Sequence, residues 1–143
     1  MKQLLLMLLV SSAAIINTKA QCLTHVKYSA GKMEILDTAL NVLDTKEEGY
    51  SVETRADGFT GIREEELDDS LHGVLKSVTC NWKEPFKNGT ITMVCDVQGK
   101  EQAMSNATIT IEAKEGHIYI YLRAQEQPDK VLRLVVDKYE EIK

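Results

Sequence analysis

The 143-residue sequence lacks the short motifs by which most catalytic and cofactor sites are recognised. It contains no Gly-x-Ser-x-Gly nucleophile turn and no glycine-rich phosphate loop. Its three histidines, His25, His72 and His117, share no metal-binding spacing, and no two cysteines form a Cys-x-x-Cys pair. We therefore predict a protein that is not an enzyme and that holds no metal or other cofactor.

One segment, residues 55–66, weakly resembles an EF-hand calcium loop. Glu66 would be its last ligand, but Arg55 stands at the first ligand position and Thr60 stands where the loop needs glycine. The acidic residues at positions 64–69 are typical of the start of a helix, where the helix dipole favours carboxylates. We therefore assign no calcium site here.

Long apolar runs are also missing, except for one at the N-terminus. Lys2 precedes an apolar run over residues 4–10, which is shorter than the about 20 residues that a spanning helix needs. Thr18 and Ala20 place small residues at positions −3 and −1 of a signal-peptidase site. We predict a cleavable signal peptide over residues 1–20, a single mature domain over residues 21–143, and export to the periplasm or the exterior.

Basic residues are too few to favour a nucleic-acid partner. The chain has 17 Lys and Arg against 22 Asp and Glu, a net charge of −5, and loss of the leader's two lysines lowers the charge to −7. A surface of this sign repels phosphate backbones. We expect no nucleic-acid binding and no transmembrane segment in the mature chain.

Only three cysteines are present, and export permits them to form a disulfide. Apolar and polar residues alternate over residues 78–84 and 91–97, and a hairpin with its loop at residues 86–89 places Cys80 opposite Cys95. We predict a Cys80–Cys95 disulfide, with two buried thiols as the alternative. Cys22 is then free, paired with another chain or lipid-modified, and the lipid anchor is the less favoured of these.

Two segments carry apolar residues at helical spacing. The first ends near Gly49 and the second runs from Glu64 to Ser77. Their apolar positions are Met33, Leu36, Leu40 and Leu43 in the first segment, and Leu67, Leu71, Val74, Leu75 and Val78 in the second. We predict two helices.

The other segments alternate as strands do. Asp57-Gly58 is a hairpin turn, and a turn at Glu115-Gly116 places Ala113, Ile111 and Ile109 opposite Ile118, Ile120 and Leu122. The predicted fold is therefore α+β, with two helices packed on one face of an antiparallel meander sheet of about five strands, plus a short N-terminal hairpin.

The polar face of this hairpin is a candidate binding face, because tyrosine and arginine are frequent in protein interfaces. Its residues are His117, Tyr119, Tyr121 and Arg123, with Thr110 and Glu112 opposite them.

We expect an exported, non-enzymatic binding domain with a protein partner, such as an inhibitor-like or envelope accessory factor. The alternative is a carrier with an apolar cavity lined by Ile109, Ile111, Ile120 and Leu122. A carboxylate-based hydrolase is the third hypothesis. The sequons at Asn88 and Asn106 leave glycosylation open.

The leader and the cysteines predict the mass of the mature protein. Mass spectrometry of protein from its native source should give a chain that begins at Gln21 and gains about two hydrogen masses on reduction, because one disulfide opens. A lipid-sized mass increment on Cys22 would contradict this processing and place the domain on a membrane.

Overall fold

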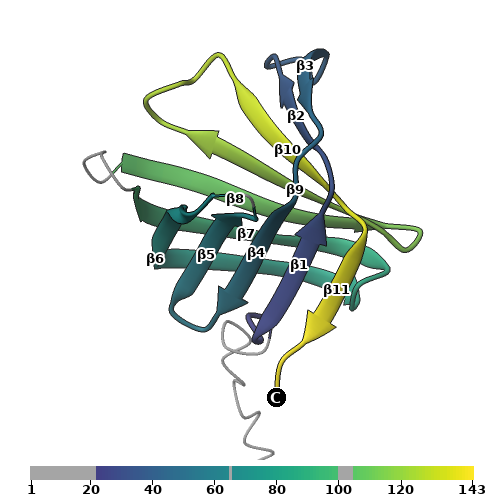
Figure 1. Ribbon diagram of the computed structural model, residues 1–143. Helices are drawn as coiled ribbons and strands as arrows, with labels where there is room; N and C mark the ends of the chain where they lie inside the picture. The colour runs from purple at the N-terminus through teal and green to yellow at the C-terminus, as the bar shows by residue number, and fades with distance from the viewer. Residues whose placement is uncertain (1–21, 65, 100–104) are drawn as a thin grey trace, which may run out of the picture.

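The computed structural model describes residues 22–64, 66–99 and 105–143. The predicted signal peptide and its cleavage site lie outside these residues. The described part of the chain contains strands and no helix, so the predicted α+β fold is wrong (Figure 1). The strands are β1 (Val26–Ala30), β2 (Met33–Leu36), β3 (Val42–Lys46), β4 (Tyr50–Arg55), β5 (Gly58–Arg63), β6 (Glu66–Glu84), β7 (Asn88–Gln98), β8 (Ser105–Lys114), β9 (His117–Ala124), β10 (Val131–Val136) and β11 (Lys138–Glu141).

All eleven strands belong to one antiparallel sheet in the order β11-β1-β4-β5-β6-β7-β8-β9-β10-β2-β3. Three short breaks along the chain join strands that are not neighbours in the sheet. Gly31 and Lys32 separate β1 from β2, Asp137 alone separates β10 from β11, and residues 47–49 separate β3 from β4. Each of these pairs of strands is therefore one bent segment of chain.

These bent segments close the sheet on itself. The first segment pairs with the last twice, through β1 with β11 and β2 with β10, and it also pairs with the second segment through β1 with β4 and β2 with β3. At the bend, the Asp137 amide donates to the Ser29 carbonyl at 2.9 Å. Figure 1 shows β5, β4, β1 and β11 in front of β6–β9. The sheet therefore encloses an interior between two layers of strands.

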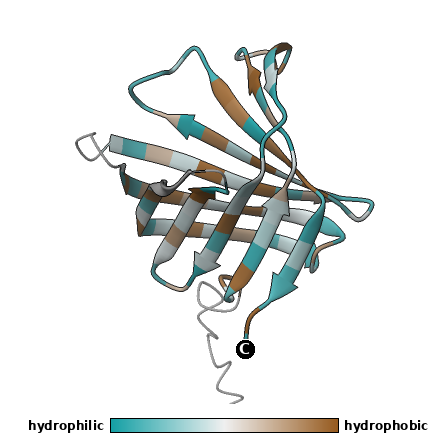
Figure 2. Cartoon of the chain, viewed as in Figure 1, coloured by the Kyte–Doolittle hydropathy of each residue, from teal (hydrophilic) through white to brown (hydrophobic). Residues whose placement is uncertain are grey.

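The interior is filled by side chains from one face of the strands, although β3 and β11 are exposed along their whole length. Burial alternates along β7 and β8, and Met93, Cys95, Ile109 and Ile111 are fully buried. Apolar and polar bands accordingly alternate along these ribbons in Figure 2. Burial of such side chains is the main favourable contribution to folding, at roughly 1.5–3 kcal/mol each.

The first predicted helix is instead the β2–β3 hairpin. Asp37 stabilises its connection, because the Asp37 Oδ1 accepts hydrogen bonds from the Ala39 and Asn41 amides, both at 2.9 Å. The four apolar residues share no face: Met33 lines the interior, Leu36 is fully buried in a separate cluster, and Leu40 and Leu43 are exposed. Pairing of β2 with β10 outweighs the local helical pattern.

The second predicted helix is part of the long strand β6. Leu71 and Leu75 are four residues apart, a spacing that suits one face of a helix and one face of a strand equally. The step of three from Leu75 to Val78 arises because a bulge between Leu75 and Ser77 shifts the alternation by one residue. Val74, which would complete a helical stripe, is exposed. The acidic cluster consequently begins no helix.

The β8–β9 hairpin has the predicted register. Ala113, Ile111 and Ile109 lie opposite Ile118, Ile120 and Leu122. Glu115 and Gly116 both have positive φ, 53° and 82°, as the two-residue turn requires. The short N-terminal hairpin is also present, as β4 and β5, but its turn residues are Ala56 and Asp57 rather than the predicted Asp57 and Gly58, because Arg55 lies opposite Gly58. The chain continues as a further strand after β10, because β11 pairs with β1.

The predicted Cys80–Cys95 disulfide is wrong. Cys80 lies opposite Ile91, and Cys95 lies opposite Leu75. A shift of four residues leaves the same faces pointing inward, so alternation alone does not distinguish the two registers. Cys80 is bonded to Cys22, and Cys95 is a buried free thiol. The disulfide therefore ties the start of the described chain to β6.

Gly73 has a packing role that can be tested. A Cβ at this position would overlap the Phe59 ring, whereas a Cβ at Gly61 would meet its nearest neighbours at 3.9 Å. We expect Gly73→Ala to lower the free energy of unfolding by about 1–3 kcal/mol, because the ring must move. Gly61→Ala, the matched control, should change it by less than about 1 kcal/mol. Equal effects in urea denaturation would contradict the packing of Phe59 on Gly73.

The disulfide should make stability depend on redox conditions. The bond closes a loop of 58 residues, and its loss should cost up to about 4 kcal/mol, because the unfolded chain gains freedom. Cys22→Ser should lower stability and abolish its dependence on reductant. Cys95→Ala should keep that dependence, although it also opens a small cavity. Loss of the dependence in Cys95→Ala would instead support pairing through Cys95.

Candidate functional site

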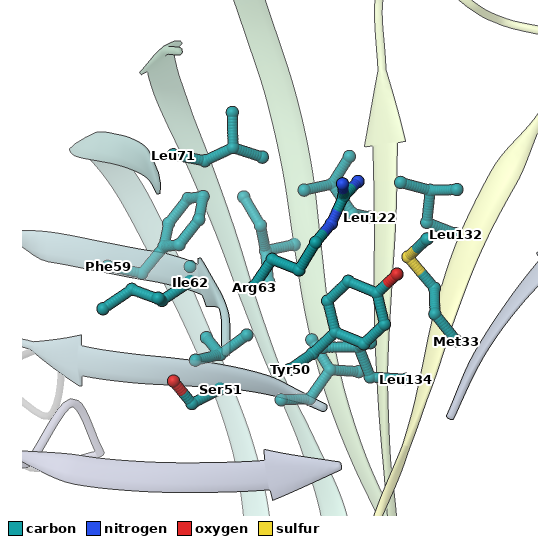
Figure 3. A pocket seen from close by; sticks show the side chains of 14 residues that line it. Met33, Tyr50, Ser51, Phe59, Ile62, Arg63, Leu71, Leu122, Leu132 and Leu134 are labelled. Carbon is teal, nitrogen blue, oxygen red and sulfur yellow. The ribbon is translucent and has the colours of Figure 1, made fainter. Parts of the chain in front are cut away.

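A cavity of about 210 Å³ lies inside the closed sheet, between β4 and β5 on one side and β8, β9 and β10 on the other (Figure 3). Nearly all its lining is apolar. The lining residues are Met33, Tyr50, Ser51, Val52, Phe59, Gly61, Ile62, Arg63, Leu71, Ile109, Ile120, Leu122, Leu132 and Leu134. Seven strands, β2, β4, β5, β6, β8, β9 and β10, thus contribute to one site, which is possible only because the sheet closes.

The cavity exists partly because Gly61 presents no side chain to it. Gly61 lies between Phe59 and Arg63 on the interior face of β5, opposite Leu71 of β6. Its Cβ position has only ordinary contacts, at 3.9 Å from Leu71 and Phe59. A larger side chain would therefore enter the cavity rather than strain the backbone. The Phe59 ring belongs both to the packed core and to the lining of the cavity.

Two polar side chains lie at one end of this apolar lining. Tyr50 and Arg63 are opposite each other on β4 and β5. Figure 3 shows both reaching away from these strands toward Leu122, Leu132 and Met33. The Tyr50 hydroxyl donates to Glu48 at 3.2 Å, and the Arg63 Nε lies 3.4 Å from the same Glu48 oxygen. Burial, and then the hydrogen bond with Glu48, raise the pKa of Tyr50. Tyr50 therefore stays a neutral donor at ordinary pH.

The cavity contains three of the four residues that the carrier hypothesis named. Ile109, Ile120 and Leu122 line it, whereas Ile111 is fully buried in the packed core. Met33, Leu71 and the two polar residues Tyr50 and Arg63 were not among the predicted lining residues. Met33 and Leu71 lie in the segments that were predicted as helices. The alternation of Tyr50 and Val52 was the one signal that placed Tyr50 on an apolar strand face.

The predicted binding face lies on the outer side of β8 and β9. Tyr121 is opposite Thr110, Tyr119 is opposite Glu112, Arg123 is opposite Thr108, and His117 is opposite Lys114. Tyr121 is buried in a cluster with Leu36 and Val131, and Tyr119 packs against this cluster. Arg123 lies 5.6 Å from the centroid of the Tyr121 ring, and Arg133 lies 5.8 Å from that of the Tyr119 ring. This face remains a prediction.

Arg133 belongs to a structural cluster on the same outer side. Its Nε donates to Glu34 Oε2 at 2.6 Å, and Lys32 Nζ lies 3.1 Å from the other Glu34 oxygen. These two cations hold the pKa of the Glu34 carboxyl below its usual value, although burial acts in the opposite direction and is the largest single influence. The ion pair joins β2 to β10, the strands that close the sheet.

The described residues hold little that resembles catalytic machinery. Ser70 Oγ and His72 Nε2 are 3.1 Å apart, but the other ring nitrogen of His72 faces Thr60 at 3.3 Å, where a triad has a carboxylate. Burial raises the pKa of the Cys95 thiol to about 11, which suppresses the reactive thiolate. No cluster of metal-ligating side chains occurs among the residues that the structure describes.

Comparisons with protein-family models, with curated proteins and with solved structures find no match for this chain. Within the described ranges, no helix is long and apolar enough to cross a membrane. The cavity is therefore the feature from which a function can be argued.

Proposed function

We propose that this protein binds a small, largely apolar molecule in the cavity inside the closed sheet. The observation that carries the proposal is an apolar cavity of about 210 Å³ in an interior that is otherwise tightly packed. Protein cores contain few voids larger than a water molecule, because each void loses packing contacts. A cavity of this size thus has a cost in stability that a ligand would offset.

The volume sets the size of the ligand. An apolar cavity of about 150 Å³ is large enough for benzene, whereas pockets for drug-sized ligands measure about 300–1,000 Å³. The cavity here lies between these limits. We infer a ligand of roughly six to ten non-hydrogen atoms, an extrapolation from the benzene case. Burial of the hydrocarbon part of such a ligand, at about 0.8 kcal/mol per methylene, supports dissociation constants from roughly millimolar to micromolar.

The expected protein partner and the exported location fit this proposal without being required by it. The Cys22–Cys80 disulfide is compatible with an oxidising compartment. Binding rather than catalysis is the favoured activity, because the cavity lining offers no pair of titratable groups arranged for acid–base chemistry.

Filling the cavity should abolish binding without harming the fold. We expect the protein to bind 1-octanol, a neutral molecule of suitable size, in isothermal titration calorimetry. Gly61→Leu should weaken this binding by about tenfold or more, because its side chain occupies the ligand volume. The melting temperature of the unliganded variant should stay equal or rise, since filling a cavity adds contacts.

The matched control is Thr60→Val, at the position of β5 next to Gly61. Valine has nearly the same shape as threonine, and the Thr60 side chain contacts His72 and does not line the cavity. It should keep the affinity of the unaltered protein. Failure of the unaltered protein to bind octanol, or undiminished binding by a folded Gly61→Leu variant, would contradict the proposal.

A further inference from the structure

The polar side chains at one end of the cavity are already bonded to one another. Tyr50 and Arg63 line the cavity, and Glu48 contacts both of them from outside the lining. A single Glu48 oxygen, Oε2, accepts the hydrogen bond of the Tyr50 hydroxyl at 3.2 Å and lies 3.4 Å from the Arg63 Nε. Arg63 also acts on Tyr50 through its charge and a hydrogen bond, which lower the pKa that burial and Glu48 raise. Each of the three side chains thus has the other two as partners.

The charges in this cluster compensate each other. Arg63 is the one charged residue among the fourteen lining residues that the structure describes, and it is paired with the Glu48 carboxylate. A ligand carboxylate at this end would meet a guanidinium that already has an anionic partner, with that partner's negative charge beside it. Glu64, whose carboxyl lies against Gly49, adds a further negative charge nearby. An incoming anion would therefore lose hydration and be repelled, without gaining a counter-ion of its own.

The wall across from this cluster offers a ligand apolar contacts. Leu122, Leu132 and Leu134 line the cavity on the side toward which Tyr50 and Arg63 reach (Figure 3). Burying an ion against such a surface costs far more than burying a neutral polar group, because the ion loses more hydration. The favourable contacts consequently come from the hydrocarbon part of a ligand, and a charge on the ligand is penalised.

We infer that the cavity selects uncharged ligands over acids of the same size and that Glu48 sets this specificity, an inference that rests on the proposed function. The favoured class is neutral molecules with a hydrocarbon body, such as medium-chain alcohols and amides, and the ionised medium-chain fatty acids are disfavoured. Glu48 acts in two ways, because it occupies Arg63 and because its own charge repels an anion. The side chains of Glu48 and Arg63 are 34% and 29% exposed, so solvent screens part of this repulsion.

Octanoate and octanamide test this selectivity, because they have the same number of non-hydrogen atoms and nearly the same shape but differ in charge. In isothermal titration calorimetry at neutral pH, the unaltered protein should bind octanamide at least about thirtyfold more tightly than octanoate. Glu48→Gln keeps an acceptor for Tyr50 and removes the charge, so it should strengthen octanoate binding by about fivefold. Its affinity for octanamide should change by less than about twofold, since the apolar lining is unaltered.

Glu47→Gln is the matched control. It makes the same change of charge at the preceding residue, which is exposed and has no ion pair among the residues that the structure describes. Because solvent screens an exposed charge, the ratio of the two affinities should stay within about twofold of that of the unaltered protein. Circular dichroism should show that both variants are folded.

The outcomes separate this inference from the proposed function. If none of octanoate, octanamide and 1-octanol binds, the proposed function fails and the inference fails with it. If 1-octanol binds but octanoate binds at least as well as octanamide, or if a folded Glu48→Gln variant discriminates against octanoate as strongly as the unaltered protein, only the inference is overturned. An equal gain in Glu47→Gln would also overturn it, because surface charge in general would then be responsible. Weak octanoate binding that Glu48→Gln improves and Glu47→Gln does not would support it.

Discussion

Pairing between the first and last segments of the chain is the constraint on which the rest of the structure depends. β2 and β10 join residues about a hundred positions apart, and β1 and β11 extend the same contact. Closing a sheet in this way pairs strand edges that would otherwise be exposed. It also converts one face of the central strands, such as β7 and β8, into an interior. The core, the cavity and the polar end of the cavity exist only because this contact forms.

The closed interior divides into two parts with different properties. In one part Met93, Cys95 and Ile111 are fully buried and leave no room for a ligand. In the other, Gly61 leaves space, and Tyr50 and Arg63 supply polar groups that a packed core would not contain. Phe59 belongs to both parts, and Gly73 allows its ring to lie there because a Cβ at Gly73 would overlap the ring. Ligand binding is thus built into one end of a scaffold that the other end stabilises.

The success of sequence-based prediction varied with the distance between the paired residues. The β8–β9 hairpin was predicted with its register, because a two-residue turn at Glu115-Gly116 fixes which residues meet. The β6–β7 register was wrong, since a three- or four-residue loop permits several registers that keep the same faces inward. The second predicted helix failed because a spacing of four residues suits both a helix and a strand. The first failed because pairing of β2 with β10 outweighs the local helical pattern. Of the site, the sequence indicated Ile109, Ile120 and Leu122 but not Arg63.

The sequence by itself determined which residues alternate, where the tightest turns lie and which strand faces are apolar, because these properties depend on neighbours within a few positions. Only the tertiary structure decided that residues 33–46 form a β-hairpin and residues 66–84 a strand, that Cys80 pairs with Cys22, and that Tyr50 and Arg63 line a cavity with Leu122 and Leu132. The physical reason is that the hydrogen bonds and burial that select these states come from partners far along the chain, which no local pattern of residues specifies.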